Sequence, residues 1–253
     1  MSGSLTVVGL GPGDAGLLTE SARRALDAAD DLVGYFPYVA RVPERLGLIR
    51  HASDNRVEVD RARHALQLAA SGRRVAVVSG GDPGVFAMAS AVFEAVEHGE
   101  PAWRDLAITV EPGITAMLAA AARLGAPLGG DFCALSLSDN LKPWPVVTAR
   151  LEAVLRADLV IALYNPISTA RPWQLGAALE LAAGIRAPET PVMFARAISR
   201  PDEAIRVSTL AEARDVPADM ATMVILGAST TRLIPRTEGL PFVYTSRKVA
   251  GPA

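Results

Sequence analysis

The chain has 253 residues, of which 50% are hydrophobic and 21% are charged, and its formal net charge is −2. This composition supports a sizeable core and excludes an extensively disordered chain, and the charge lacks the basic excess that is typical of nucleic-acid-binding proteins. Cys133 is the single cysteine, which excludes an intramolecular disulfide and favours a reducing, cytoplasmic compartment.

The first half of the chain alternates strand-like and helix-like patterns. Short apolar runs predict strands at residues 5–10, 32–35, 75–78 and 106–110. Apolar residues at helical spacing predict helices at residues 19–28, 60–71, 85–96 and 115–124. We expect a proline-broken aromatic loop at residues 34–39 and irregular structure at 43–55. The alternation predicts an α/β fold with a largely parallel sheet.

The stretch APLGG at residues 126–130 marks the expected boundary between two α/β domains, 1–128 and 129–253. After it, strands are predicted at residues 132–137, 159–164, 192–195 and 223–226, and helices at 146–156 and 172–184. Because this half has more consecutive strands and fewer crossovers, we expect its sheet to be mixed.

Three glycine-containing turns follow three of the predicted strands in the first half. They are GLGPGD at residues 9–14, SGGDPG at 79–84 and EPGIT at 111–115. Parallel strands end at one sheet edge, where α/β proteins bind ligands, so we expect the turns to form the floor of one ligand site. The adjacent Gly80 and Gly81 let a backbone come close to a ligand. Asp82 is expected to accept from ligand hydroxyls or to cap the next helix.

An NAD site is a competing interpretation of the first turn, because Gly9, Gly11 and Gly13 mimic a dinucleotide fingerprint. The second predicted strand ends in Leu-Val-Gly-Tyr at residues 32–35, without the acidic residue that would hold a ribose diol. This difference favours another ligand.

Two predicted strand ends in the second half carry hydrogen-bonding groups. These are SLSDN at residues 136–140 and Tyr-Asn-Pro at 164–166. Each pattern is typical of a solvated turn or of a ligand contact. We treat three of these residues as candidate substrate contacts: Ser138, Asn140 and Asn165.

Neither a membrane-spanning segment nor a protein-bound metal is expected. No apolar run reaches about 18 residues. The three histidines, His51, His64 and His98, are scattered and give no zinc-ligand spacing with the single cysteine. No Ser-His-Asp set is apparent, so hydrolysis by that route is not expected either.

The motifs VVGLGPGD, SGGDPGVF, EPGITA and ALYNP, in this order and spacing, resemble the tetrapyrrole (corrin and sirohaem) methyltransferase family over nearly the whole chain. The resemblance implies two α/β domains with S-adenosylmethionine in the cleft between them, S-adenosylhomocysteine as the product, and a homodimer. The segments GYFPYV, SLSDNLKPW and LYNPIS look most like members that methylate precorrin-3B at carbon 17 with ring contraction, in cobalamin synthesis.

Carried over position by position, the resemblance implies a set of cofactor contacts. They are Pro12, Gly80, Gly81, Asp82, Val85, Thr115, Ala116, Tyr164, Ala197 and Thr222. The many carboxylates of a tetrapyrrole suit arginine forks. Arginines in loop-like stretches are therefore candidates, with surface solvation as the alternative, at Arg41, Arg45, Arg171, Arg196 and Arg200.

The implied reaction is an in-line displacement at a sulfonium methyl, in which the protein mainly positions the two reactants. Loss of a substrate hydroxyl proton would drive the ring contraction, so a general base is expected. Asp14, at the mouth of the first turn, is the candidate, and a capping role is the alternative. Two other functions stay open: methylation of cobalt-factor III in the anaerobic route, and non-catalytic carriage of a tetrapyrrole.

Overall fold

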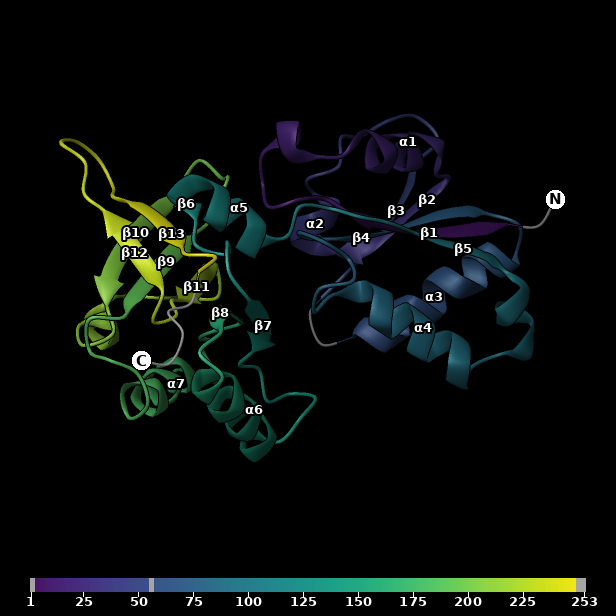
Figure 1. Ribbon diagram of the computed structural model, residues 1–253. Coiled ribbons are helices and arrows are strands. Elements are labelled where there is room, and N and C mark those ends of the chain that lie inside the picture. Colours follow the sequence, from purple (N-terminus) through teal and green to yellow (C-terminus); the bar gives the residue numbers. More distant parts are fainter. Residues whose placement is uncertain (1–2, 55–56, 249–253) are drawn as a thin grey trace. The chain divides into compact units, whose positions relative to one another are not determined.

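The computed structural model describes residues 3–54 and 57–248 of the chain (Figure 1). By their internal contacts the residues divide into two compact units, Met1–Thr115 and Ala116–Ala253. Both units are α/β, as predicted. The predicted boundary after residue 128 states where the chain divides into independently folding domains. A division by contacts does not test this, so the boundary stays a prediction.

The sheet of unit 1 has five strands in the order β3-β2-β4-β1-β5, and every neighbouring pair is parallel. The predicted parallel character of this sheet is therefore confirmed. The strands are β1 (Ser4–Gly9), β2 (Asp31–Tyr35), β3 (Ile49–Ser53), β4 (Arg74–Ser79) and β5 (Ala107–Glu111).

Helices cover both faces of this sheet, because alternate strand residues pack in opposite directions. Val7 and Val77 belong to a core with α3 and α4, whereas Val8 and Val78 belong to a core with α1. In Figure 1, α3 and α4 lie side by side below the sheet and α1 lies above it. The helical segments are α1 (Glu20–Ala28), α2 (Phe36–Val39), α3 (Glu58–Ala70), α4 (Met88–His98) and the short 3-10 turns η1 (Ala15–Leu17) and η2 (Pro101–Asp105).

Two segments of unit 1 differ from the sequence-based expectation. The aromatic loop expected at residues 34–39 contains the short helix α2, whose first turn holds Pro37; that position suits proline, because no N–H is required there. The stretch expected to be irregular contains β3, an edge strand that pairs only with β2. Most of β3 is partly exposed, so it lacks the apolar pattern by which a buried strand is recognised.

Unit 2 contains a mixed five-stranded sheet in the order β10-β9-β11-β8-β7, as predicted. Only β7 and β8 run parallel, and the other neighbours are antiparallel. Its strands are β7 (Phe132–Ser136), β8 (Val160–Tyr164), β9 (Pro191–Arg196), β10 (Ala204–Thr209) and β11 (Thr222–Leu226). A small sheet, which the sequence did not predict, contains β6 (Gly125–Ala126), β12 (Thr231–Ile234) and β13 (Phe242–Thr245).

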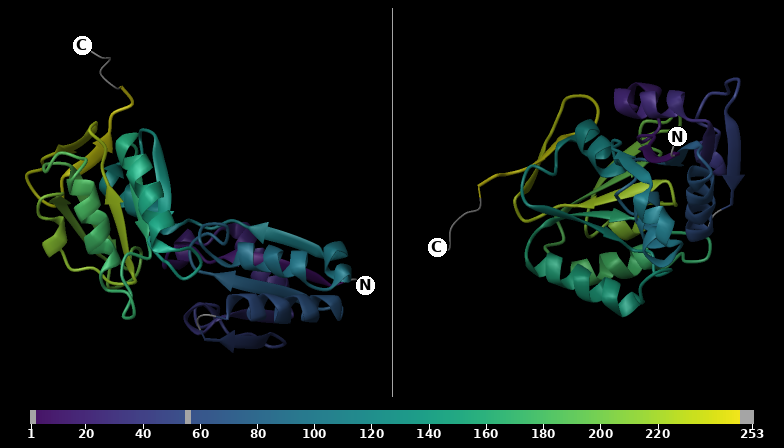
Figure 2. Two further views of the ribbon diagram at one scale, coloured as in Figure 1. Left: turned by 90° about the horizontal axis from the view of Figure 1, so that it is seen from below. Right: turned by 90° about the vertical axis from the view of Figure 1, so that its right-hand side faces the viewer.

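The core of unit 2 forms where two helices pack on one face of the five-stranded sheet. Leu151 of α6 and Leu179 of α7 are buried with Phe194 of β9 in one cluster. Figure 2 shows these two helices side by side in further views. The helical segments of unit 2 are α5 (Ala116–Leu124), α6 (Trp144–Arg156), α7 (Gln174–Ala183) and the 3-10 turn η3 (Ala213–Asp215). None of the helices in the described part of the chain is long and apolar enough to span a bilayer.

A buried arginine joins three elements of unit 2. The Arg186 side chain is 4% exposed. Its guanidinium donates to the carbonyls of Leu155 (3.2 Å) and Leu159 (2.7 Å), and also to that of Gly227. Burial lowers the pKa of Arg186, and the nearby Asp158 carboxylate opposes this effect. Arg186 thereby supplies hydrogen bonds to backbone acceptors near the end of α6, before β8 and after β11.

We expect Arg186→Met to lower the free energy of unfolding by about 2–4 kcal/mol, because it leaves buried carbonyls without a donor. Arg156→Met is the matched control. Arg156 pairs with Glu152 on the exposed surface of α6 at 2.7 Å, so its loss should cost less than about 1 kcal/mol. Urea unfolding measures both values, and equal losses would contradict the role assigned to Arg186.

Candidate functional site

The three glycine turns of unit 1 meet at the carboxyl edge of its sheet. Strand β1 lies between β4 and β5, in a register that pairs Gly9 with Ser79 and Val8 with Glu111. Just beyond the strands, the Gly11 N–H donates to the Gly81 carbonyl (3.1 Å), and the Gly81 N–H donates to the Gly11 carbonyl (2.9 Å). The structure therefore brings the turns together, as the parallel strand order predicted.

The Asp82 carboxylate links the second turn to the third. One of its oxygens accepts from the Gly84 N–H at 2.8 Å, and the other accepts from the Gly113 N–H at 3.0 Å. Hydrogen bonds from backbone N–H groups to an ionised carboxylate are stronger than neutral ones. Asp82 therefore holds the site together, in addition to any contact that it makes with a ligand.

Several glycines at this edge are required by the turns themselves. A Cβ at Gly113 would lie 2.1 Å from the Gly81 carbonyl oxygen, and a Cβ at Gly9 would lie 2.7 Å from the Gly113 nitrogen. Gly81 has φ +66°, which favours glycine. A Cβ at Gly80 would lie 2.7 Å from the ring of Tyr38. Close packing within the fold is therefore a reason for glycine at these positions in addition to the approach of a ligand.

The other predicted residues of unit 1 lie on these turns or next to them. Pro12 is buried in the first turn, Val85 follows the second turn, and Thr115 is 5% exposed after the third. Asp14 is exposed, and its carboxylate caps η1 by accepting from the Gly16 N–H at 2.7 Å. The structure therefore shows the capping role that was the alternative for Asp14, and its role as a base stays a prediction.

The candidate residues of unit 2 gather at one edge of its sheet. Ser138 follows β7, Asn165 follows β8 and Ala197 follows β9, while Thr222 begins β11, which runs in the opposite direction. Asn165 and Ala197 have φ of +52° and +48°; asparagine tolerates this left-handed region, whereas it is strained for alanine. Such strain is concentrated at functional sites, and the surrounding structure must maintain it.

Hydrogen bonds fix most of these side chains. Asn165 donates from Nδ2 to the Ser136 hydroxyl at 2.9 Å, and the Thr222 hydroxyl donates to the Asp219 carboxylate at 2.9 Å. Burial alone would raise the pKa of Asp219, but hydrogen bonds from Arg196 and Thr222 lower it below its usual value. The edge is thus held in one arrangement.

Tyr164 and Ala116 are neighbours through the start of α5. The Tyr164 hydroxyl accepts from the N–H of Met117, the residue after Ala116, at 3.4 Å. On the β7 side, the Ser138 hydroxyl accepts from Arg171 at 2.9 Å and from the Asn140 N–H at 3.4 Å. Within unit 2, the structure therefore groups these candidates at strand ends and at a helix start.

The structure separates the candidate arginines by their contacts. Arg45 holds the carbonyls of Leu26 and Ala29 at the end of α1, so we do not propose it as a substrate contact. Arg196 forms ion pairs with Asp202 and Asp219. Arg171 contacts Ser138 and Asp139, and Arg41 contacts backbone carbonyls of the first turn. Arg200 donates from its backbone N–H to the carbonyl of the candidate residue Ala197 at 2.9 Å, and Arg196 pairs with Thr222 in the strand register.

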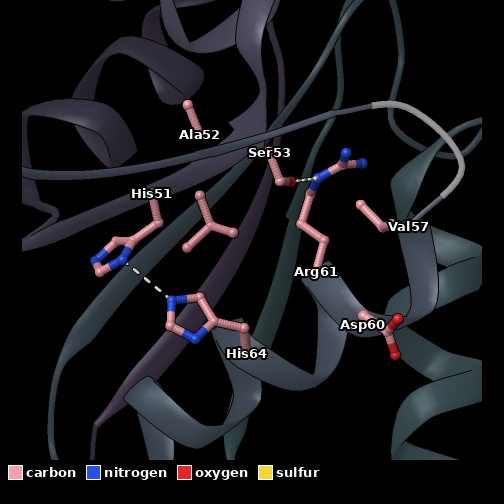
Figure 3. Close-up of a pocket in the computed structure, with 8 residues that line it drawn as sticks. His51, Ala52, Ser53, Val57, Asp60, Arg61 and His64 are labelled. Atoms are coloured by element: carbon pink, nitrogen blue, oxygen red, sulfur yellow. Dashed lines mark hydrogen bonds between the residues drawn. The ribbon is translucent and has the colours of Figure 1, made fainter.

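A cavity of about 380 Å³, which the sequence did not predict, lies between β3 and α3 (Figure 3). Its polar wall contains His51 and His64, whose ring nitrogens lie 3.1 Å apart, and His51 lies 2.8 Å from the Asp31 carboxylate. Burial and the neighbouring His51 lower the pKa of His64. Burial would raise the pKa of Asp31, but hydrogen bonds from Arg73 and His51 lower it. Because β3 was not predicted, sequence spacing could not reveal this pair.

The hydrogen-bonded series His64, His51 and Asp31 joins α3, β3 and β2 and offers few metal ligands. Throughout residues 3–54 and 57–248, no three side chains of His, Cys, Asp or Glu are grouped so that they could hold a metal ion. The glycine turns, where the ends of three parallel strands meet, are the main candidate site of unit 1.

Comparisons with known proteins agree with this architecture. The model of the Tetrapyrrole (Corrin/Porphyrin) Methylases matches residues 4–214. The precorrin-3B C(17)-methyltransferase of a Sinorhizobium species is 55% identical over 99% of both chains. A probable cobalt-factor III C(17)-methyltransferase of Salmonella typhimurium is 39% identical, over 90% of this chain and 93% of that protein. The crystal structure of the methyltransferase CobJ matches with a TM-score of 0.91 and 52% identity, over 97% of this chain and 100% of that one.

Gly113→Ala tests the close packing of the turns. Its Cβ would displace the Gly81 carbonyl, so we expect the free energy of unfolding to fall by about 1–3 kcal/mol, as in other overpacked sites. Gly176→Ala in α7 is the control, because a Cβ there meets no atom within 4 Å and alanine favours a helix. Urea unfolding should show a loss for the first variant only; an unchanged Gly113→Ala protein would contradict the packing argument.

Proposed function

We propose a function for this chain from the premise that it belongs to the tetrapyrrole (corrin/porphyrin) methylase family, as the family match and the 55% identical relative show. It is a methyltransferase of cobalamin biosynthesis, and its reaction is the methylation of precorrin-3B at carbon 17 with ring contraction to precorrin-4. The observation that carries this proposal is the 55% identity to a precorrin-3B C(17)-methyltransferase over 99% of both chains.

The methyl donor that we propose is S-adenosylmethionine. The turns at Gly11, Gly81 and Gly113 lie together at the carboxyl edge of the unit 1 sheet, which is where α/β proteins bind ligands. In unit 1 the proposed contacts are Pro12, Gly80, Gly81, Asp82, Val85 and Thr115. In unit 2 they are Ala116, Tyr164, Ala197 and Thr222. When bound, the donor supplies an activated methyl group.

The work of the protein in such a reaction is positioning, because the leaving group is already good. The turns are rigid for this purpose, since paired backbone groups and the Asp82 carboxylate hold them. We assign proton removal from the substrate to Asp14, which lies at the first turn with an exposed carboxylate. One of its oxygens accepts from Gly16, and the other is the atom that we propose takes the proton.

The proposed substrate contacts are Ser138, Asn140 and Asn165, which lie on loops at one edge of the unit 2 sheet. Loops of this kind set specificity within a fold family. Methylation of cobalt-factor III is the second candidate function, since a probable cobalt-factor III enzyme is 39% identical. The higher identity to the precorrin-3B enzyme favours the metal-free substrate. A cytoplasmic location is also part of the proposal, and it rests on the composition with one cysteine.

Turnover of two substrates tests the assignment. Purified protein is incubated with S-adenosylmethionine and either metal-free precorrin-3B or cobalt-factor III, after titration calorimetry with S-adenosylhomocysteine. We expect S-adenosylhomocysteine to bind with a dissociation constant in the micromolar range, which corresponds to a binding free energy of about −8 kcal/mol. We also expect a product one methyl group heavier from precorrin-3B. Turnover of cobalt-factor III alone would assign the chain to the anaerobic route. Turnover of neither, with tetrapyrrole binding retained, would indicate a carrier.

We also propose a homodimer. The hairpin of β12 and β13 exposes Ile234, Phe242 and Tyr244 on one face, which is a suitable surface for a second copy. Light scattering at micromolar concentration should therefore give about twice the chain mass of 26.5 kDa. A mass near that of one chain would contradict the proposal.

A further inference from the structure

The segment that follows β2 places a charged side chain on the first glycine turn. Arg41, just after α2, donates from Nη2 to the carbonyl of Leu10 at 2.7 Å and to that of Gly11 at 3.1 Å. These are the first two carbonyls beyond β1. A single Nη2 that donates to two successive carbonyls restrains both peptide groups, because the directions of its two hydrogens are fixed by the planar guanidinium.

The peptide groups that Arg41 contacts also pair the first turn with the second. The Gly11 carbonyl accepts from the Gly81 N–H at 2.9 Å as well as from Arg41, and the Leu10 N–H donates to the Ser79 carbonyl at 2.9 Å. Gly11 has φ +66°, a backbone conformation that most other residues would not maintain without support from neighbouring groups. Arg41 therefore contacts the first turn at the Gly11 carbonyl, which also accepts the hydrogen bond from Gly81 of the second turn.

The backbone around Arg41 is itself held in place. Its N–H donates to the Tyr38 carbonyl at 3.1 Å, and Arg50 donates to the carbonyls of Val39 (3.1 Å) and Val42 (2.6 Å). The Tyr38 ring packs so closely on Gly80 that a Cβ there would clash with it. The segment therefore contacts both turns, with Arg41 on the first and Tyr38 on the second.

We propose that Arg41 is a positioning residue of the methyl-donor site, where it holds the Leu10 and Gly11 carbonyls so that the first turn stays paired with Gly81. This inference rests on the proposed function for its ligand, S-adenosylmethionine. Arg41 acts through the turn, since the contacts that carry the argument are to backbone carbonyls. Without it the turn samples other conformations, and a ligand must select the productive one, which weakens the apparent affinity.

Arg45 provides a matched control four positions later. It also donates from Nη2 to two backbone carbonyls, those of Leu26 and Ala29. These carbonyls lie at the end of α1, just before β2 begins, and therefore near the amino edge of the parallel sheet. Removal of either arginine deletes the same kind of interaction, but only Arg41 lies at the glycine turns.

The experiment compares wild type with Arg41→Ala, Arg41→Lys and Arg45→Ala. For Arg41→Ala we expect the dissociation constant of S-adenosylhomocysteine and the KM for S-adenosylmethionine to rise about tenfold, in the range of one lost charged hydrogen bond, with kcat changed less. Arg41→Lys should recover part of the affinity, because an ammonium group still donates. Arg45→Ala should lower the urea midpoint and leave the dissociation constant unchanged.

Amide hydrogen exchange, followed by NMR, adds a readout that needs no ligand. The Gly81 N–H, which donates to Gly11, should exchange at least about tenfold faster in Arg41→Ala and at the wild-type rate in Arg45→Ala. Equal dissociation constants and equal Gly81 exchange in the two alanine variants would overturn the role of Arg41. If wild type itself binds no S-adenosylhomocysteine, the proposed function fails, and the exchange rates alone then decide whether Arg41 holds the turn.

Discussion

Two backbone hydrogen bonds between Gly11 and Gly81 are the constraint on which the candidate site depends. They bring the turns after β1 and β4 so close that the third turn fits only with glycine at position 113. The Asp82 carboxylate then attaches this third turn through the Gly113 N–H. Hydrogen bonds within the fold thus hold the three turns together. Such preorganisation suits a reaction in which positioning is the main contribution of the protein.

The edge of the unit 2 sheet that carries the candidate residues is held by other interactions than the turns of unit 1. Unit 1 has positive φ at Gly11, Gly81 and Phe86 in or next to its turns, and unit 2 has positive φ at Asn165, Ala197 and Ser199. These conformations are unfavourable for residues with a Cβ, and neighbouring bonds maintain them: the Ala197 N–H donates to the Ala221 carbonyl, and the Ser199 N–H donates to Glu203. The Ser199 hydroxyl is buried and has no hydrogen-bond partner among the described residues. Strain and an unsatisfied hydroxyl at one strand end are consistent with a ligand-binding role for this loop.

The loops after β7 and β8 are held by side chains, whereas the glycine turns of unit 1 are held mainly by backbone groups. Arg171, on the loop after β8, bonds to Ser138 and Asp139 on the loop after β7, and the Trp144 and Trp173 rings pack edge to face with centroids 4.8 Å apart. The turns of unit 1 are thus joined mainly through backbone groups, and the loops after β7 and β8 through side chains.

The sequence by itself determined the α/β class, the parallel sheet of unit 1, the mixed sheet of unit 2 and the family. Local signals carried these conclusions: apolar runs such as residues 75–78, the cap at Thr19, and glycine turns in a fixed order. Only the tertiary structure decided that β3 is a strand, since its pairing with β2 and not its own pattern defines it. Tertiary structure also showed that Asp82 bonds to Gly113 and that Arg41 holds Leu10 and Gly11, because these partners lie far apart in sequence. Hydrogen bonds between distant segments leave no periodic signal in a sequence, so they become visible only when the fold brings those segments together.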